Sequence, residues 1–106
     1  MEKVTLETKA DNTLAFVLYD NQKKAGEMVV TIRGNELTAE HTEMEPFYQG
    51  RGFGAKLVDG MAEYVRSNGM IVTVLCPYSY SQFNRDPEKY NDIWNRHKRP
   101  PGIRLT

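Results

Sequence analysis

The sequence has few residues that could form disulfide bonds or bind a structural metal ion. It contains one cysteine, Cys76, so an intramolecular disulfide is excluded, which fits a protein of a reducing compartment. Its two histidines, His41 and His97, are far apart in the sequence. Because a metal site needs several ligands gathered together, the sequence predicts no metal centre.

The sequence also lacks an excess of charge and any long apolar run. Its 14 Lys and Arg balance 14 Asp and Glu, so it has no basic footprint of the kind that duplex nucleic-acid binders carry. The longest uninterrupted apolar stretch, residues 14–19, is far shorter than the roughly 20 residues that cross a bilayer. The first residues lack the apolar core of a signal peptide. We therefore expect a cytoplasmic protein with neither a nucleic-acid nor a membrane partner.

What the sequence does contain fits one globular domain. It has 106 residues, where a domain has about 150, and 40% of them are hydrophobic. We expect a single domain over residues 1–106. Its last residues, 96–106, read as a basic tail interrupted by prolines.

The first 44 residues predict strands. Val4 and Leu6 alternate with polar neighbours, and two further apolar runs occupy residues 14–19 and 28–32. Gly34-Asn35 separates the third run from residues 36–44, and such a pair is a hairpin signal because primed turns require a positive φ. The sequence therefore predicts an antiparallel meander of four strands.

After residue 52 the apolar period lengthens to four. Apolar residues recur on one helical face at Phe53, Leu57, Met61 and Val65. This pattern predicts an amphipathic helix of about four turns, ended by Asn68-Gly69. Gly60 within the helix indicates that another segment approaches it closely there.

The segment that follows the helix is nearly all apolar. Residues 70–76 are rich in β-branched side chains, which is typical of a strand buried on both faces. Strand, helix and buried strand form a crossover unit, so the fourth and fifth strands should be parallel. Asp86-Pro87-Glu88 predicts the start of a short helix toward Trp94. The expected fold class is α+β.

The stretch Gln49-Gly50-Arg51-Gly52-Phe53-Gly54, here called the glycine loop, lies just before the amphipathic helix. Free amides at a helix start attract anions, and glycine lets a ligand approach the backbone. The pattern therefore suits a phosphate cradle, or else a tight turn that needs positive φ. It is neither a Walker loop, which ends in Gly-Lys-Ser/Thr, nor a dinucleotide fingerprint.

The glycine loop resembles the pyrophosphate-binding motif of the GNAT superfamily of acetyl-CoA-dependent N-acetyltransferases. The runs His41-Thr42-Glu43-Met44 before it and Leu75-Cys76-Pro77-Tyr78 after it resemble a group of small, single-domain members. Pro87-Glu88-Lys89-Tyr90 is similar to their later Pro-Glu-Tyr element, with Lys89 as an interruption. The resemblance covers about residues 26–94.

This resemblance implies the GNAT fold, in which the fourth and fifth strands splay apart to admit the pantetheine arm of acetyl-CoA. Main-chain groups of three residues would hydrogen-bond that arm: Thr42, Glu43 and Met44. Backbone amides of the loop would hold the pyrophosphate: Gln49, Gly50, Arg51, Gly52, Phe53, Gly54 and Ala55. By the same analogy, Phe83 and Asn84 would form the second wall of the cofactor site, and Cys76 would lie near the acetyl group.

Acetyl transfer to an amine needs a group that takes the amine proton and an acid for the departing thiolate. His41 and Glu43 are two residues apart and so share one strand face, where either is a candidate base. His41 would also share that face with Leu37 and Ala39, so a core role is equally open.

The acid has three candidates near the end of the buried strand. Cys76 lies where the strands should separate, although a buried free cysteine is usually a small hydrophobe. Tyr78 and Tyr80 are the alternatives, because GNAT members often use a tyrosine beyond the fifth strand, and ordinary aromatic packing is expected for at least one of them.

The sequence thus predicts an N-acetyltransferase that moves acetyl directly from acetyl-CoA to a primary amine on a small molecule, a lysine or an N-terminus. The alternative is a non-catalytic acyl-CoA-binding module that regulates a partner. The chain has no room for the helices that build the acceptor pocket in larger members, so the acceptor stays open. We expect a monomer or a weak dimer.

Overall fold

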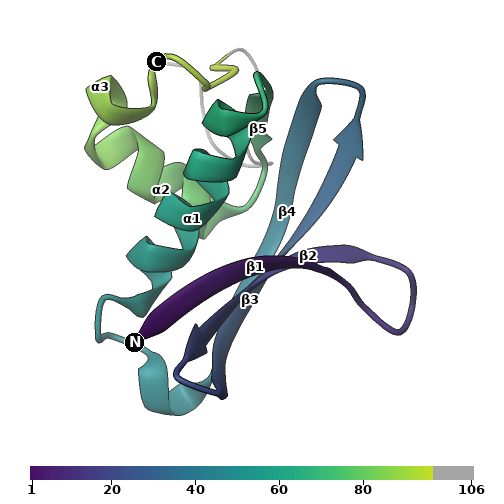
Figure 1. The fold of residues 1–106 in the computed structure, drawn as a ribbon. Helices are drawn as coiled ribbons and strands as arrows, with labels where there is room; N and C mark the ends of the chain where they lie inside the picture. Colours follow the sequence, from purple (N-terminus) through teal and green to yellow (C-terminus); the bar gives the residue numbers. More distant parts are fainter. Residues whose placement is uncertain (97–106) are drawn as a thin grey trace.

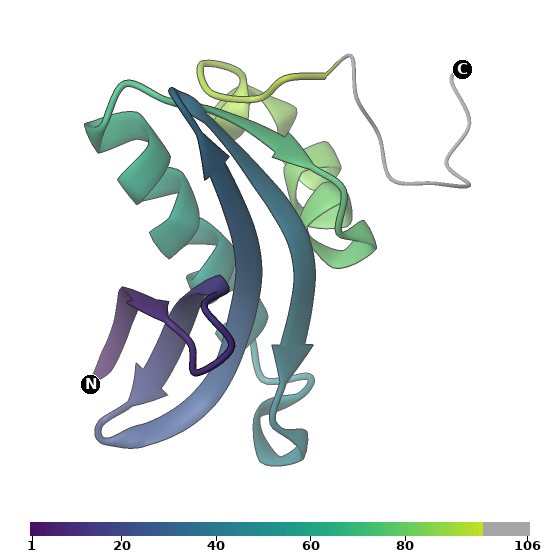
Figure 2. The same ribbon diagram turned by 90° about the vertical axis from the view of Figure 1, so that its right-hand side faces the viewer.

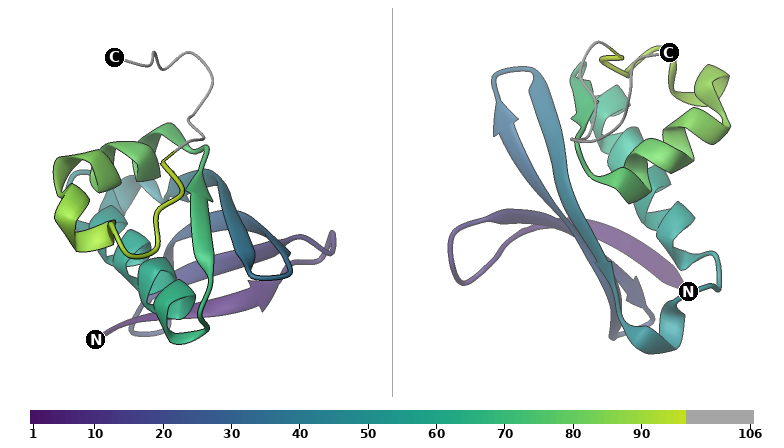
Figure 3. Two further views of the ribbon diagram at one scale, coloured as in Figure 1. Left: turned by 90° about the horizontal axis from the view of Figure 1, so that it is seen from above. Right: turned by 180° about the vertical axis from the view of Figure 1, so that it is seen from behind.

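The computed structural model describes residues 1–96. The elements follow in the order β1 (Glu2–Thr8), β2 (Leu14–Asp20), β3 (Lys23–Arg33), β4 (Glu36–Met44), the 3-10 turn η1 (Pro46–Tyr48), α1 (Phe53–Ser67), β5 (Ile71–Val74), α2 (Pro77–Arg85) and α3 (Pro87–Tyr90). The three helices lie on one side of the sheet (Figures 1 and 3). No helix in this part of the chain is long and apolar enough to span a bilayer.

The sheet has the topology that the sequence predicts. Its strands follow one another in sequence order, β1 to β4 antiparallel and β5 parallel to β4. The turn between β3 and β4 contains Gly34 with φ of +58°, as a hairpin signal requires. The α+β class and the parallel crossover through α1 are confirmed.

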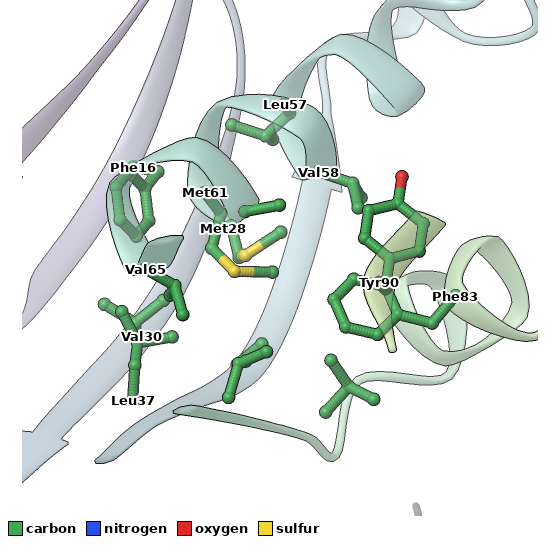
Figure 4. Packing of buried hydrophobic residues seen from close by; sticks show 14 of the residues in the cluster. Phe16, Met28, Val30, Leu37, Leu57, Val58, Met61, Val65, Phe83 and Tyr90 are labelled. Atoms are coloured by element: carbon green, nitrogen blue, oxygen red, sulfur yellow. The ribbon is translucent and has the colours of Figure 1, made fainter. Parts of the chain in front are cut away.

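The core lies between the sheet and α1. Of the predicted helical stripe, Leu57, Met61 and Val65 are buried and Phe53 is partly buried. The stripe packs against side chains from the sheet, which include Phe16, Met28 and Leu37 (Figure 4). Gly60 faces β1 so closely that an added Cβ would lie 2.7 Å from the Cβ and both methyl groups of Val4. The close approach that Gly60 indicates is therefore real.

A bulge in β4 changes which side chains face the core. Val29 of β3 pairs with His41 and Val30 with Ala39, so Glu40 is an extra residue in β4. Leu37 and Ala39 are fully buried, but His41 is exposed. The prediction that these three residues share a face is wrong, because the bulge reverses the alternation beyond Ala39.

The segment after β5 contains a helix that the sequence pattern does not predict. The predicted strand over residues 70–76 is shortened to β5, and α2 begins at Pro77 directly after Cys76. Proline suits this first helical position because its missing N–H has no helical partner to lose. The predicted helix at Pro87 exists, but it ends at Tyr90, before Trp94.

The other face of the sheet is covered by no described helix and carries a buried carboxylate. Glu27 of β3 is 7% exposed and forms ion pairs with Lys9 and Lys24. Burial raises the pKa of Glu27, but the hydrogen bonds from both lysines outweigh it and hold the pKa below its usual 4.5. The group is therefore charged and paired at neutral pH.

Candidate active site

β5 leaves β4 halfway along its length. The two strands pair over Glu36–Ala39 and Ile71–Val74, and the amides of Leu75 and Cys76 then both donate to the carbonyl of Ala39, at 2.9 and 3.0 Å. From there β5 turns away into α2 while β4 continues to Met44 (Figure 2). Within the described chain, residues 40–44 have no strand neighbour on this side, which is the splay that the resemblance implies.

The splay opens into a groove of about 530 Å³ that reaches the start of α1. The groove combines β4, the glycine loop, α1 and α2. It is lined by Thr42, Met44, Tyr48, Gln49, Gly50, Gly52, Gly54, Ala55, Tyr78, Gln82 and Arg85. Two of the residues predicted for the pantetheine arm and five of those predicted for the pyrophosphate thus line one groove, whereas Glu43, Arg51 and Phe53 do not.

The glycine loop presents open backbone at the start of α1. Gly50 and Gly52 have φ of +72° and +81°, and a Cβ at either would meet no protein atom within 4 Å. Gly52 is the N-cap of α1 and supplies no side-chain cap, so the first amides of the helix are available to a ligand. Open space, bare amides and the positive end of a 15-residue helix suit a phosphate group.

Tyr78 of α2 closes over this loop. An added Cβ at Gly54 would clash with the Tyr78 hydroxyl, so any larger residue there would require the ring to shift. That hydroxyl has no hydrogen-bond partner among residues 1–96. Burial raises the pKa of Tyr78, so the hydroxyl stays protonated at neutral pH, and Tyr78 is one of the residues that line the groove.

Cys76 lies at the base of the splay. It is buried, and its thiol donates to the Thr42 hydroxyl at 3.2 Å. The contact links β4, just after its bulge, to the N-cap position of α2. Thr42 lines the groove and Cys76 does not, so the Thr42 side chain separates the thiol from the groove.

His41 and Glu43 do share a face, as predicted, but it is the face opposite the groove. Thr42 and Met44 point into the groove, and the residues that alternate with them point away. The His41 Nε2 and Glu43 Oε1 atoms are 3.2 Å apart, with 61% and 71% of the side chains exposed. The two candidate bases thus lie on the far side of β4 from the groove.

Side chains of the glycine loop also make contacts that fix its position. The Arg51 guanidinium lies 4.4 Å from the centre of the Phe47 ring, and the rings of Phe53 and Tyr48 are 4.7 Å apart. The Gln49 side-chain amide donates to the carbonyl of Met44 at 3.3 Å and so ties the loop to the end of β4.

The predicted second wall requires a correction. Phe83 is fully buried and stacks on Tyr90 with ring centres 4.1 Å apart, so it cannot contact a ligand (Figure 4). Asn84 is exposed and lines neither the groove nor the neighbouring hollow between α1, α2 and α3. Tyr80 packs edge-on against Trp94 at 5.9 Å, away from the groove.

The residues of α2 that line the groove are instead Tyr78, Gln82 and Arg85. Their spacing of four and three residues places them on one face of α2. Part of the signal was present in the sequence: Pro77, like Pro87, suits the first position of a helix, although Cys76 is not a favoured N-cap residue as Asp86 is. Reading Pro77 as a helix start would have selected these three residues.

Two further predictions concern metals and the tail. No group of three or more His, Cys, Asp or Glu side chains within residues 1–96 is placed to hold a metal ion. Of the predicted basic tail, Arg96 lies over the Trp94 ring in a different hollow, and residues 97–106 lie outside the described residues.

Comparisons with solved structures agree with this fold. A search of curated proteins found no match. The solution structure of a GCN5-like candidate N-acetyltransferase from Staphylococcus aureus has a similar fold, with a TM-score of 0.56 at 20% identity over 85% of this chain and 86% of that one. A candidate acetyltransferase of unknown function from meticillin-resistant Staphylococcus aureus gives a TM-score of 0.53 at 15% identity, over 100% of this chain and 99% of that one.

The family model described as GCN5-related N-acetyl-transferase matches residues 6–93, which include every strand except the start of β1, the glycine loop, the groove and α2. Members of this family use acetyl-CoA as co-substrate. The chain therefore belongs to the GCN5-related N-acetyltransferases.

Proposed function

We propose that this chain transfers acetyl from acetyl-CoA directly to a primary amine on a small molecule, a lysine side chain or an N-terminus. The observation that carries the proposal is the groove, which joins the splay between β4 and β5 to the bare amides at the start of α1. A long ligand with a phosphate at one end and a neutral chain at the other matches this shape.

The main chain is assigned to binding. The amides of residues 49–55 hold the pyrophosphate, because glycines at 50, 52 and 54 let it approach and the dipole of α1 favours its charge. Main-chain groups of Thr42, Glu43 and Met44 hydrogen-bond the pantetheine arm, since this part of β4 pairs with β3 on one edge and, in the described chain, has no strand partner on the edge toward β5. Met44 also gives this end of the groove an apolar surface.

The side chains near the splay are assigned to proton movement. In the reaction the bond from the acetyl carbon to sulfur breaks, a bond to nitrogen forms, the amine loses a proton and the thiol gains one. Tyr78 is the preferred acid because it lines the groove and because its protonated hydroxyl has no hydrogen-bond partner in the described chain. Cys76 is the second candidate, held beside Thr42.

His41 and Glu43 are assigned to the amine. They face the opposite side of β4, so an acceptor that reaches the splay from that side would meet them without displacing the co-substrate. Because the pair is exposed to solvent, either residue can pass a proton to water.

Calorimetric titration with acetyl-CoA, CoA and ADP tests the binding step. Micromolar binding that requires the pantetheine arm supports the groove assignment, whereas no binding to folded protein contradicts it. Release of free thiol from acetyl-CoA with a panel of primary amines then tests catalysis. The variants C76A, H41A and E43A should slow this release, and binding without release from any amine would favour the regulatory module.

A further inference from the structure

A second hollow continues the groove along α1. It has a volume of about 320 Å³ and lies between α1, α2 and α3. Three residues line both spaces: Ala55, Gln82 and Arg85. The second hollow therefore begins beside the amides assigned to the pyrophosphate and leads away from the splay.

The charged side chains in this hollow differ in whether they have an ion-pair partner. Lys89 forms an ion pair with Asp59 at 2.8 Å, and the Tyr90 hydroxyl donates to the same carboxylate oxygen at 2.8 Å. Burial and this hydrogen bond raise the pKa of Tyr90 to about 12, so the hydroxyl stays a donor. The charge of Asp59 is thus balanced by Lys89, and its carboxylate accepts a further hydrogen bond from Tyr90.

Arg85 differs from Lys89 in having no ion-pair or hydrogen-bond partner among residues 1–96. It is exposed and stands at the junction of the two spaces. A guanidinium presents a planar fork of N–H donors that matches a phosphate, and such bonds are stronger than neutral ones. Asp86 also borders the hollow, as an acceptor suited to a sugar hydroxyl rather than to a phosphate.

We propose that the second hollow binds the 3′-phosphoadenosine end of CoA, and that Arg85 pairs with the 3′-phosphate so that the protein selects CoA over 3′-dephospho-CoA. This rests on the proposed function, because that function places the pyrophosphate at Ala55. The nucleotide then leaves the cradle in the direction of Arg85, while the pantetheine arm runs the other way to Thr42.

The described basic residue of the tail does not serve this purpose. Arg96 donates to the carbonyl of Pro87 at 3.3 Å and lies 4.7 Å from the centre of the Trp94 ring. It lines a different hollow, together with Asn35 and Glu36. Arg96 is therefore a matched control for Arg85: both are exposed arginines, and only Arg85 borders the groove.

Calorimetric titration of the full chain with CoA and with 3′-dephospho-CoA tests the proposal. The unmodified protein should bind CoA about tenfold more tightly, as expected of a charge-assisted hydrogen bond to one phosphate. In Arg85→Gln this ratio should fall to about one through weaker CoA binding, with unchanged affinity for dephospho-CoA. Arg96→Gln should keep the tenfold ratio.

The outcomes separate this proposal from the one on which it rests. Equal binding of the two ligands by the unmodified protein, or a ratio that survives in Arg85→Gln, would overturn the assignment of Arg85 and leave the acetyltransferase groove intact. Failure of both ligands to bind folded protein would overturn both proposals. Because Arg85 has no partner to lose in the described chain, the variant should fold, and an unchanged melting temperature checks this.

Discussion

Two glycines at opposite ends of α1 allow an effect on pyrophosphate binding to be separated from an effect on stability. Gly52 precedes the helix with φ of +81°, and Gly69 follows it with φ of +64°. At neither position would an added Cβ meet a protein atom within 4 Å. Gly52 lines the groove, and Gly69 does not.

Alanine at either site carries the same backbone penalty. A left-handed conformation costs a non-glycine residue about 1 to 2 kcal/mol, and the stiffer unfolded chain returns about 0.4 to 1 kcal/mol of that. The net loss of about 1 kcal/mol corresponds to a melting temperature lower by about 5 °C for a domain near 100 residues. Gly52→Ala and Gly69→Ala should therefore melt at nearly the same temperature.

Binding of acetyl-CoA should separate them. At Gly52 the new methyl group stands in the space that we assign to the pyrophosphate, so affinity should fall at least about tenfold, or 1.4 kcal/mol. Gly69→Ala should bind as the unmodified protein does. Calorimetry on both variants, at a temperature where both are folded, gives the comparison. Equal affinity in the two variants would refute the cradle, and the glycines would then serve only a tight turn.

Three further outcomes follow from named contacts. Gly60→Ala should lower the melting temperature, because overpacking against Val4 costs about 1 to 3 kcal/mol while helix propensity returns about 1 kcal/mol; a more stable variant would contradict the packing. Glu27→Gln should cost about 1 to 2 kcal/mol at pH 7. Because the pKa of Glu27 is lowered in the folded state, this contribution is present above pH 4.5 and is lost as the pH falls below it, so the variant's urea-unfolding curves should converge with the native ones in acid. Tyr78→Phe should reduce kcat about 100-fold and leave the melting temperature unchanged, whereas Tyr80→Phe should not alter kcat.

Local sequence signals predicted the parts of the fold that depend on neighbours in the chain. The period-four stripe of α1, the Gly34 turn and the parallel crossover were all correct because periodicity and turn geometry decide them. α2 was missed because its apolar face is short: only Ser79 and Phe83 are buried, too few to show a period.

The orientation of β4 could not be predicted in the same way, and the division of the site depends on it. Strict alternation would put His41 and Glu43 on the core face with Ala39, and would leave Thr42 and Met44 in solvent. The extra residue, Glu40, is visible only in the pairing of β4 with β3, so no pattern within β4 reveals it. By reversing the alternation just where β5 departs, the bulge turns Thr42 and Met44 into the groove and the polar pair to the other face. One inserted residue thus separates the two tasks that we propose for this strand: binding the co-substrate on one side and meeting an acceptor on the other.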